Sequence, residues 1–180
     1  MRIETTRLLI RPWQEADHDP WAAISADPEV RRYYWPSVLT REESDQGIAW
    51  CERHLAKHGF GFVAVERRSD KALVGGLGFS WAAEEVPNGP HVEIGWIFGR
   101  QYWGQGLAYE AAQAALAWAS QHIAAPEIIG YTSAINTPSR RLMEKLGMRY
   151  DPADDFEDTS VPEGNPLRPH VLYRIANRAD

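Results

Sequence analysis

Residues 101–106 read Gln-Tyr-Trp-Gly-Gln-Gly and separate an alternating apolar run, Val92 to Phe98, from an alanine-rich run, Leu107 to His122. The first run has the pattern of a β-strand and the second that of a helix. Glycine at 104 and 106 permits a tight turn in which successive backbone N–H groups point toward one site. Because the following helix adds the positive end of its dipole, the segment is predicted to bind phosphate.

Two other phosphate-binding motifs are excluded by these same residues. A P-loop requires Gly-Lys-Ser/Thr, and no lysine lies near Gly104 or Gly106. A dinucleotide fingerprint requires a third glycine where this chain has Tyr109. An ordinary tight turn between a strand and a helix remains the alternative.

A second polar turn lies further along the chain, at residues 136–139. Thr137 is predicted to cap a short helix with Pro138 at its first position, and Gly147 suits a left-handed C-terminal cap. These structural roles leave Asn136 unexplained. Its amide offers a ligand both a donor and an acceptor.

Together the two segments resemble the coenzyme A motifs of the Gcn5-related N-acetyltransferases, Arg/Gln-x-x-Gly-x-Gly/Ala and Asn-x-x-Ser/Ala followed by Leu-x-x-x-Leu-Gly-Phe/Met. Residues 4–13, with Thr-Arg-Leu-Leu-Ile-Arg, and residues 93–96, Glu-Ile-Gly-Trp, are similar to the branch that includes the ribosomal-protein-alanine acetyltransferases. The resemblance runs from about residue 3 to about residue 175.

The resemblance implies an enzyme that transfers an acetyl group from acetyl-CoA to a primary amine by direct attack in a ternary complex. The amine would belong to a peptide N-terminus or a small molecule. Pantetheine would pair with the strand backbone, pyrophosphate would bind the glycine-containing loop, and the thioester would meet the second segment. The implied cofactor contacts are Trp96, Phe98, Gln101, Trp103, Gly104, Gln105, Gly106, Leu107, Ala108, Asn136 and Ser139.

Catalytic groups are suggested by the alternation of the strand Val92 to Phe98. Glu93 and Gly95 share one face, so the carboxylate has open space beside it, close to where the resemblance places the thioester. Glu93 is therefore the predicted general base, with a buried carboxylate satisfied by backbone or arginine as the alternative. Ser139 is predicted to serve the departing thiolate, because Met143 replaces a tyrosine that does so in many relatives.

That replacement keeps a second function open, namely a noncatalytic acyl-CoA-binding or sensing module with the same fold. The acceptor site is also only outlined. Tyr33, Tyr34 and Trp35 resemble the family's acceptor-pocket wall, with ordinary core packing as the alternative. The acidic segment 151–163 is expected to be a solvated loop, with attraction of a cationic acceptor as the alternative.

Composition sets further limits on function. A net charge of -6 disfavours nonspecific binding of nucleic acid. One cysteine, Cys51, excludes an internal disulfide, and its spacing to His54 and His58 lacks a metalloprotease order, so no metal is expected. No run is long enough to span a membrane, and Met1 leads into a strand rather than a signal peptide, so a cytoplasmic protein is expected. The resemblance also allows a homodimer, because edge strands in this fold often pair between two copies.

The expected fold is mixed α/β, one domain over residues 1–180 with a mostly antiparallel, twisted sheet of six to seven strands and about four helices. Helices are expected from Asp17 to near Pro28 and from Thr40, in a capping box with Glu43, to about Lys57. The remaining strands are expected at Arg7 to Trp13, Phe60 to Glu66, Ala72 to Ser80, Ile128 to Thr132, Met148 to Asp151 and Val171 to Ile175.

Overall fold

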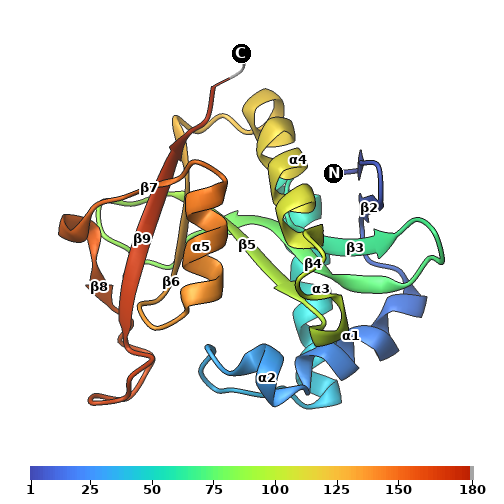
Figure 1. Cartoon of the computed structure of the whole chain (residues 1–180), viewed down its shortest axis with the longest axis horizontal. Helices are drawn as coiled ribbons and strands as arrows, with labels where there is room; N and C mark the ends of the chain where they lie inside the picture. Colours follow the sequence, from blue (N-terminus) through green and yellow to red (C-terminus); the bar gives the residue numbers. More distant parts are fainter. Residues whose placement is uncertain (179–180) are drawn as a thin grey trace.

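The computed structural model describes residues 1–178, whose nine strands form one sheet in the order β1-β2-β3-β4-β5-β6-β9-β7, with β8 paired to β9 (Figure 1). The strands are β1 (Ile3–Glu4), β2 (Leu8–Arg11), β3 (Phe62–Arg67), β4 (Leu73–Trp81), β5 (Val92–Phe98), β6 (Glu127–Ser133), β7 (Arg149–Tyr150), β8 (Phe156–Glu157) and β9 (Pro169–Ala176). The helices are α1 (His18–Ser25), α2 (Pro28–Arg31), α3 (Arg41–His58), α4 (Leu107–His122) and α5 (Thr137–Lys145), with 3₁₀ turns η1 (Glu15–Asp17), η2 (Arg100–Tyr102) and η3 (Pro152–Asp154).

The predicted mixed α/β architecture is confirmed, with more strands than expected. The additional strands are short: β1, β7 and β8 contain two residues each. A two-residue strand has no alternating pattern of its own, because its existence depends on pairing with a longer neighbour. None of the described helices is both long and apolar enough to cross a lipid bilayer.

Helices cover both faces of the sheet. On one face, α4 contributes a line of buried residues to the largest core cluster, Leu107, Ala111, Ala112, Ala115 and Ala119, and α5 adds Met143. On the other face, Trp21 of α1 and Ile48 of α3 pack with Trp13. The small alanine side chains let α4 approach the sheet closely, which holds the first turn of α4 beside the end of β5.

Local sequence patterns correctly predicted the boundaries of several helices and strands. β5 and α4 have the predicted limits, and α3 begins after the predicted capping box, in which Thr40 N–H donates to Glu43 at 2.7 Å. Gly59 ends α3 with a φ of 78°, a left-handed value that suits glycine.

One predicted helix end and two predicted capping residues differ from those in the structure. The helix expected to run from Asp17 to near Pro28 ends at Ser25, and Pro28 instead begins α2. The side chain of Asp17 does not cap α1, because it binds Arg11. Asn136, not Thr137, caps α5.

Arg11 is the centre of a buried ionic cluster that joins β2, η1 and β3. Its guanidinium donates to both carboxylate oxygens of Asp17, at 2.6 and 2.9 Å, and to Glu66 at 2.9 Å. Arg11 and Asp17 are only 4% and 3% exposed. The bond to Asp17 and, to a lesser degree, that to Glu66 raise the pKa of Arg11 despite its burial. The Arg11 guanidinium therefore stays charged in the folded state.

Arg11→Met should lower the free energy of unfolding by about 3–5 kcal/mol, because it leaves two carboxylates poorly solvated and without their cation. Urea denaturation followed by tryptophan fluorescence measures this loss. Arg2→Met, which breaks an exposed pair with Glu4, is the control and should cost about 0–1 kcal/mol. Equal losses in the two variants would contradict a structural role for the cluster.

Candidate active site

The loop between β5 and α4 presents free backbone donors. Gly104 and Gly106 have left-handed φ angles of 72° and 74°, and Gly106 immediately precedes α4. Within residues 1–178, the N–H groups of residues 104–109 find no acceptor, and the first helical bond runs from Glu110 N–H to the Gly106 carbonyl. An anion placed here would meet several donors and the positive end of the α4 dipole.

Side chains of the loop hold its shape. Trp103 Nε1 donates to the Phe98 carbonyl at 2.8 Å, and Gln105 Nε2 donates to the Gln101 carbonyl at 2.9 Å. The Trp103 N–H itself donates to Arg100 at 3.2 Å and is not available to a ligand. Gln101 and Trp103 therefore shape the loop, while the free amides begin at Gly104.

The N-terminal segment fastens this loop from outside. Arg7 Nη1 donates to the Gln105 carbonyl at 2.9 Å, and Arg7 Nε donates to Glu110 at 2.6 Å. Thr5 Oγ1 also donates to Glu110 at 2.6 Å. Burial alone would raise the pKa of Glu110, but the bonds from Thr5 and Arg7 outweigh it and lower that pKa. This contact has no local sign in the sequence, because it joins residues 103 positions apart.

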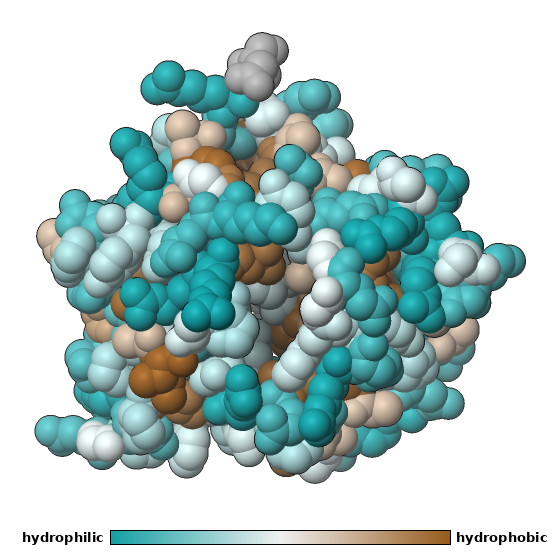
Figure 2. All heavy atoms as spheres, viewed as in Figure 1, coloured by the Kyte–Doolittle hydropathy of each residue, from teal (hydrophilic) through white to brown (hydrophobic). Residues whose placement is uncertain are grey.

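A gap in the sheet lies next to the loop. β5 and β6 are parallel but pair only at Val92 with Ile128 and Glu93 with Ile129. Beyond these pairs the strands separate, and the surface is hollowed between α5 and α4, with hydrophobic groups inside and hydrophilic residues around it (Figure 2). The open edge of β5 includes Trp96, which lines the gap, whereas the Phe98 side chain is buried in the core.

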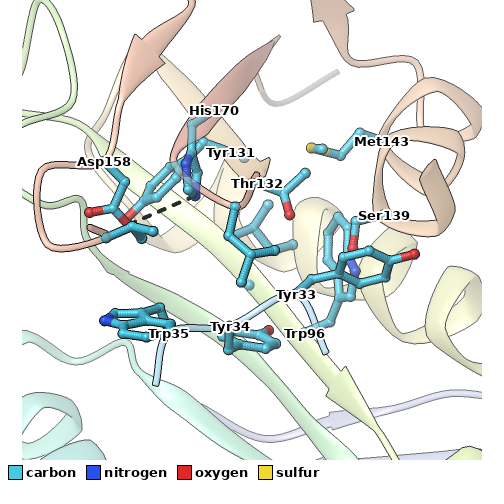
Figure 3. Close-up of a pocket in the computed structure, with 15 residues that line it drawn as sticks. Tyr33, Tyr34, Trp35, Trp96, Tyr131, Thr132, Ser139, Met143, Asp158 and His170 are labelled. Atoms are coloured by element: carbon cyan, nitrogen blue, oxygen red, sulfur yellow. Dashed lines mark ion pairs between the residues drawn. The ribbon is translucent and has the colours of Figure 1, made fainter. Parts of the chain in front are cut away.

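The gap contains a cavity of about 260 Å³. Its lining combines residues from β5, β6 and α5 with the loop after α2 and the segment before β9: Tyr33, Tyr34, Trp35, Ile94, Gly95, Trp96, Gly130, Tyr131, Thr132, Ser139, Met143, Asp158, Val161, Leu167 and His170. Figure 3 shows Ser139, Trp96 and Met143 toward one end and Asp158 with His170 toward the other, with Tyr34 and Trp35 along one side.

Glu93 lies just behind this lining. Ser80 Oγ donates to its carboxylate at 2.7 Å, and the Tyr131 hydroxyl lies near it. Burial raises the pKa of Glu93, and these two hydroxyl donors only partly oppose the rise. No arginine or lysine pairs with Glu93 among residues 1–178, in contrast to the structural alternative considered from sequence. A Cβ added to Gly95 would meet nothing within 4 Å, so the predicted open space beside Glu93 is present.

Tyr131 connects Glu93 to the cavity and was not identified from sequence. Tyr131 lies on β6, across the gap from Gly95 of β5, and it lines the cavity. Burial, with the nearby carboxylates of Glu93 and Asp158, raises the pKa of its phenol, which therefore stays protonated. A neutral phenol can accept a hydrogen bond from a group in the cavity while it donates its own proton toward a neighbouring carboxylate, here that of Glu93.

In the second predicted segment, residues 136–139, Asn136 and Ser139 have different roles. Asn136 Oδ1 accepts from Ser139 N–H at 3.3 Å, and Asn136 Nδ2 donates to Thr132 Oγ1 at 2.8 Å. The amide that seemed free for a ligand is thus engaged in positioning α5 against β6. Ser139 and Met143 line the cavity, and the Met143 thioether carries no proton to donate.

The acidic segment is largely exposed, as expected of a solvated loop, but several of its acids have partners within the protein. Asp154 pairs with Arg174 at 2.7 Å, Glu157 with Arg168 at 2.7 Å, and Asp155 accepts from the Tyr150 hydroxyl at 2.9 Å. The two arginines follow their acids by 20 and 11 positions, one on β9 and the other just before it. Asp158 alone of the segment's acids lines the cavity, and neither Asp158 nor His170 was singled out from sequence.

A family model described as an acetyltransferase (GNAT) domain matches residues 7–149. The uncharacterized N-acetyltransferase YnaD of Bacillus subtilis (strain 168) is 31% identical over 176 residues, 97% of this chain and 96% of that protein. A GNAT-family acetyltransferase structure from Bacillus anthracis is similar with a TM-score of 0.79 and 30% identity, over 98% and 99% of the two chains. RimL, a ribosomal L7/L12 alpha-N-protein acetyltransferase solved with coenzyme A, shares the fold at a TM-score of 0.78 and 16% identity, over 100% of both chains. The chain therefore belongs to the GNAT acetyltransferase family.

Proposed function

We propose that this protein is a single-domain N-acetyltransferase, spanning residues 1–180, that moves an acetyl group from acetyl-CoA to a primary amine of a peptide N-terminus or small molecule. The observation that carries the proposal is the gap between β5 and β6. It lies between a loop of free N–H donors and a partly buried carboxylate without a cationic partner. Membership of the GNAT family and the coenzyme A in the RimL structure support the same cofactor.

The cofactor would lie along the open edge of β5. Its pyrophosphate would accept from the N–H groups of Gly104, Gln105, Gly106, Leu107 and Ala108, and its pantetheine would pair with the backbone of Trp96 and Phe98. Gln101 and Trp103 would contribute by holding the loop. Asn136 would act through Ser139, which its side chain positions near the thioester end.

The acceptor would enter beside Tyr33, Tyr34 and Trp35. Its ammonium form must lose a proton before it can attack, and Glu93 would take that proton through Tyr131 or one water. The amine nitrogen would then form a bond to the thioester carbonyl carbon, and the carbon–sulfur bond would break. The thiolate would receive a hydrogen bond or proton through Ser139, because Met143 has none to give.

Glu93→Gln should lower kcat by roughly 10²-fold or more while leaving acetyl-CoA affinity nearly unchanged, because only general-base help is lost. Since burial raises the pKa of Glu93, its basic form is lost at a higher pH than for an ordinary glutamate. The wild-type rate should therefore fall as the pH falls through that raised pKa, and the variant should lose this dependence. Release of free coenzyme A with an accepted amine measures both effects.

Glu84→Gln, a change of an exposed acid on the loop after β4, is the matched control and should retain wild-type kinetics. A Glu93→Gln enzyme with unchanged kcat and an unchanged pH profile would remove Glu93 from the mechanism. Bulk water would then be the next acceptor of the proton to test.

Gly104→Val should abolish measurable acetyl-CoA binding in titration calorimetry. A branched side chain disfavours the left-handed backbone at φ 72° and obstructs approach of the pyrophosphate to the loop amides. Gly164→Val is the matched control, because Gly164 has a similar φ of 78° in an exposed loop away from the cofactor loop. Unchanged affinity in a folded Gly104→Val protein would refute the cofactor assignment.

The alternative is a noncatalytic acyl-CoA-binding or sensing module, favoured by the buried Met143 where many relatives carry a proton-donating tyrosine. Both functions require acetyl-CoA binding. A panel of amines separates them, because only an enzyme would consume acetyl-CoA in an amine-dependent way. Binding without consumption across the panel would favour the sensing module.

A further inference from the structure

We propose that the preferred acceptor is a small diamine or polyamine, whose second positive charge is held by Asp158 at the end of the cavity away from Ser139. This inference rests on the proposed acetyl transfer and adds to it the chemical class of the acceptor. It assigns Asp158 as a specificity-determining residue rather than a catalytic one.

Asp158 is available to a cation. Its Oδ1 accepts from the N–H and hydroxyl of Ser160, at 2.9 and 2.6 Å, which fixes the carboxylate. Its Oδ2 lies 4.0 Å from Nε2 of His170, whose Nδ1 is engaged with the Arg168 carbonyl at 3.0 Å. In the part of the chain that the structure describes, no lysine or arginine pairs with Asp158.

The neighbouring acids are instead occupied. Asp154 and Glu157 each pair with an arginine, and Asp155 is bonded to a tyrosine hydroxyl. A fixed carboxylate without a lysine or arginine partner, in a segment where Asp154 and Glu157 each have an arginine, is suited to an external cation. Because Asp158 lines the cavity, that external cation would be part of the acceptor.

The rest of the lining agrees with a cationic, carboxylate-free acceptor. The described residues around the cavity include no lysine or arginine, whereas Glu93 lies behind Tyr131 and Asp158 lies at one end. Tyr34 and Trp35 run along one side, where aromatic rings attract an ammonium group (Figure 3). A free α-amino acid would bring a carboxylate with no cation to receive it, so this class of acceptor is disfavoured.

The shape of the cavity sets the size of the acceptor. Figure 3 places Ser139 and Asp158 toward opposite ends, so one amine can meet the thioester while a second charge reaches Asp158. A volume of about 260 Å³ corresponds to about nine water-sized groups. A short chain with an ammonium group at each end satisfies both limits.

The test compares matched amines of equal chain length: propylamine with 1,3-diaminopropane, and butylamine with 1,4-diaminobutane. For the wild-type protein, kcat/KM should be about tenfold or more higher for each diamine, beyond the statistical advantage of two equivalent amines. Asp158→Asn should remove this preference while leaving the monoamine rate unchanged. Glu163→Gln, which removes the same charge from an exposed site in the same segment, should keep the preference.

Other outcomes overturn the proposal. Equal kcat/KM for diamine and monoamine, a preference that survives Asp158→Asn, or glycine used as well as the diamine would each refute it while leaving acetyl transfer intact. If Asp158→Asn does not fold, the wild-type protein provides the test, because the diamine preference should decrease as salt is raised from low to high concentration. A salt-independent preference would refute the role of charge.

Failure of the proposed function is recognised separately. If no amine is acetylated, binding of 1,3-diaminopropane is followed through the fluorescence of Trp35 and Trp96, which line the cavity. Binding by the wild-type protein that is weakened about tenfold in Asp158→Asn, but not in Glu163→Gln, would support the cation site without catalysis. Absence of diamine binding to the wild-type protein would overturn the inference.

Discussion

The early separation of β5 from β6 is the constraint on which the rest of the site depends. Two parallel strands that pair at only two positions leave the remaining edge of β5 without a neighbour. Each strand nevertheless has a long antiparallel partner on its other side, β4 for β5 and β9 for β6. The sheet can therefore be open in its middle and rigid on both sides of the opening, which is what a preformed binding site requires.

Backbone N–H donors lie on one side of this opening, and carboxylates lie on the other. The α4 end offers backbone donors and a positive dipole, while the opposite part of the cavity offers carboxylates without any paired arginine or lysine among residues 1–178. Residues 104–106 of the loop are exposed, so water hydrates their N–H groups in the unliganded protein, and a bound anion would replace that water. An anionic cofactor and a cationic acceptor would complement the two sides.

Local patterns in the sequence were sufficient for the elements that carry their own period or cap. The alternation of β5, the apolar face of α4 and the Thr40 capping box are properties of neighbouring residues, and their limits were predicted correctly. Tyr131, Asp158 and His170 have no such local sign, because the pairing of β9 with β6 and with β8 brings them together. Asp17 and Asn136 were misread because both can cap a helix: the Asp17 side chain binds Arg11 instead of capping α1, whereas the Asn136 side chain caps α5 instead of being free for a ligand.

The contact between Arg7 and Glu110 makes the loop at residues 101–106 depend on a segment near the N-terminus. The two residues are separated by 103 positions, so the loop acquires its outer support only after the first strands and α4 have come together. Contacts of such high sequence separation are entropically costly and usually form late in folding. A chain folding from its N-terminus would therefore complete the sheet edge before it could hold coenzyme A, and bound cofactor would in turn protect that edge from local unfolding.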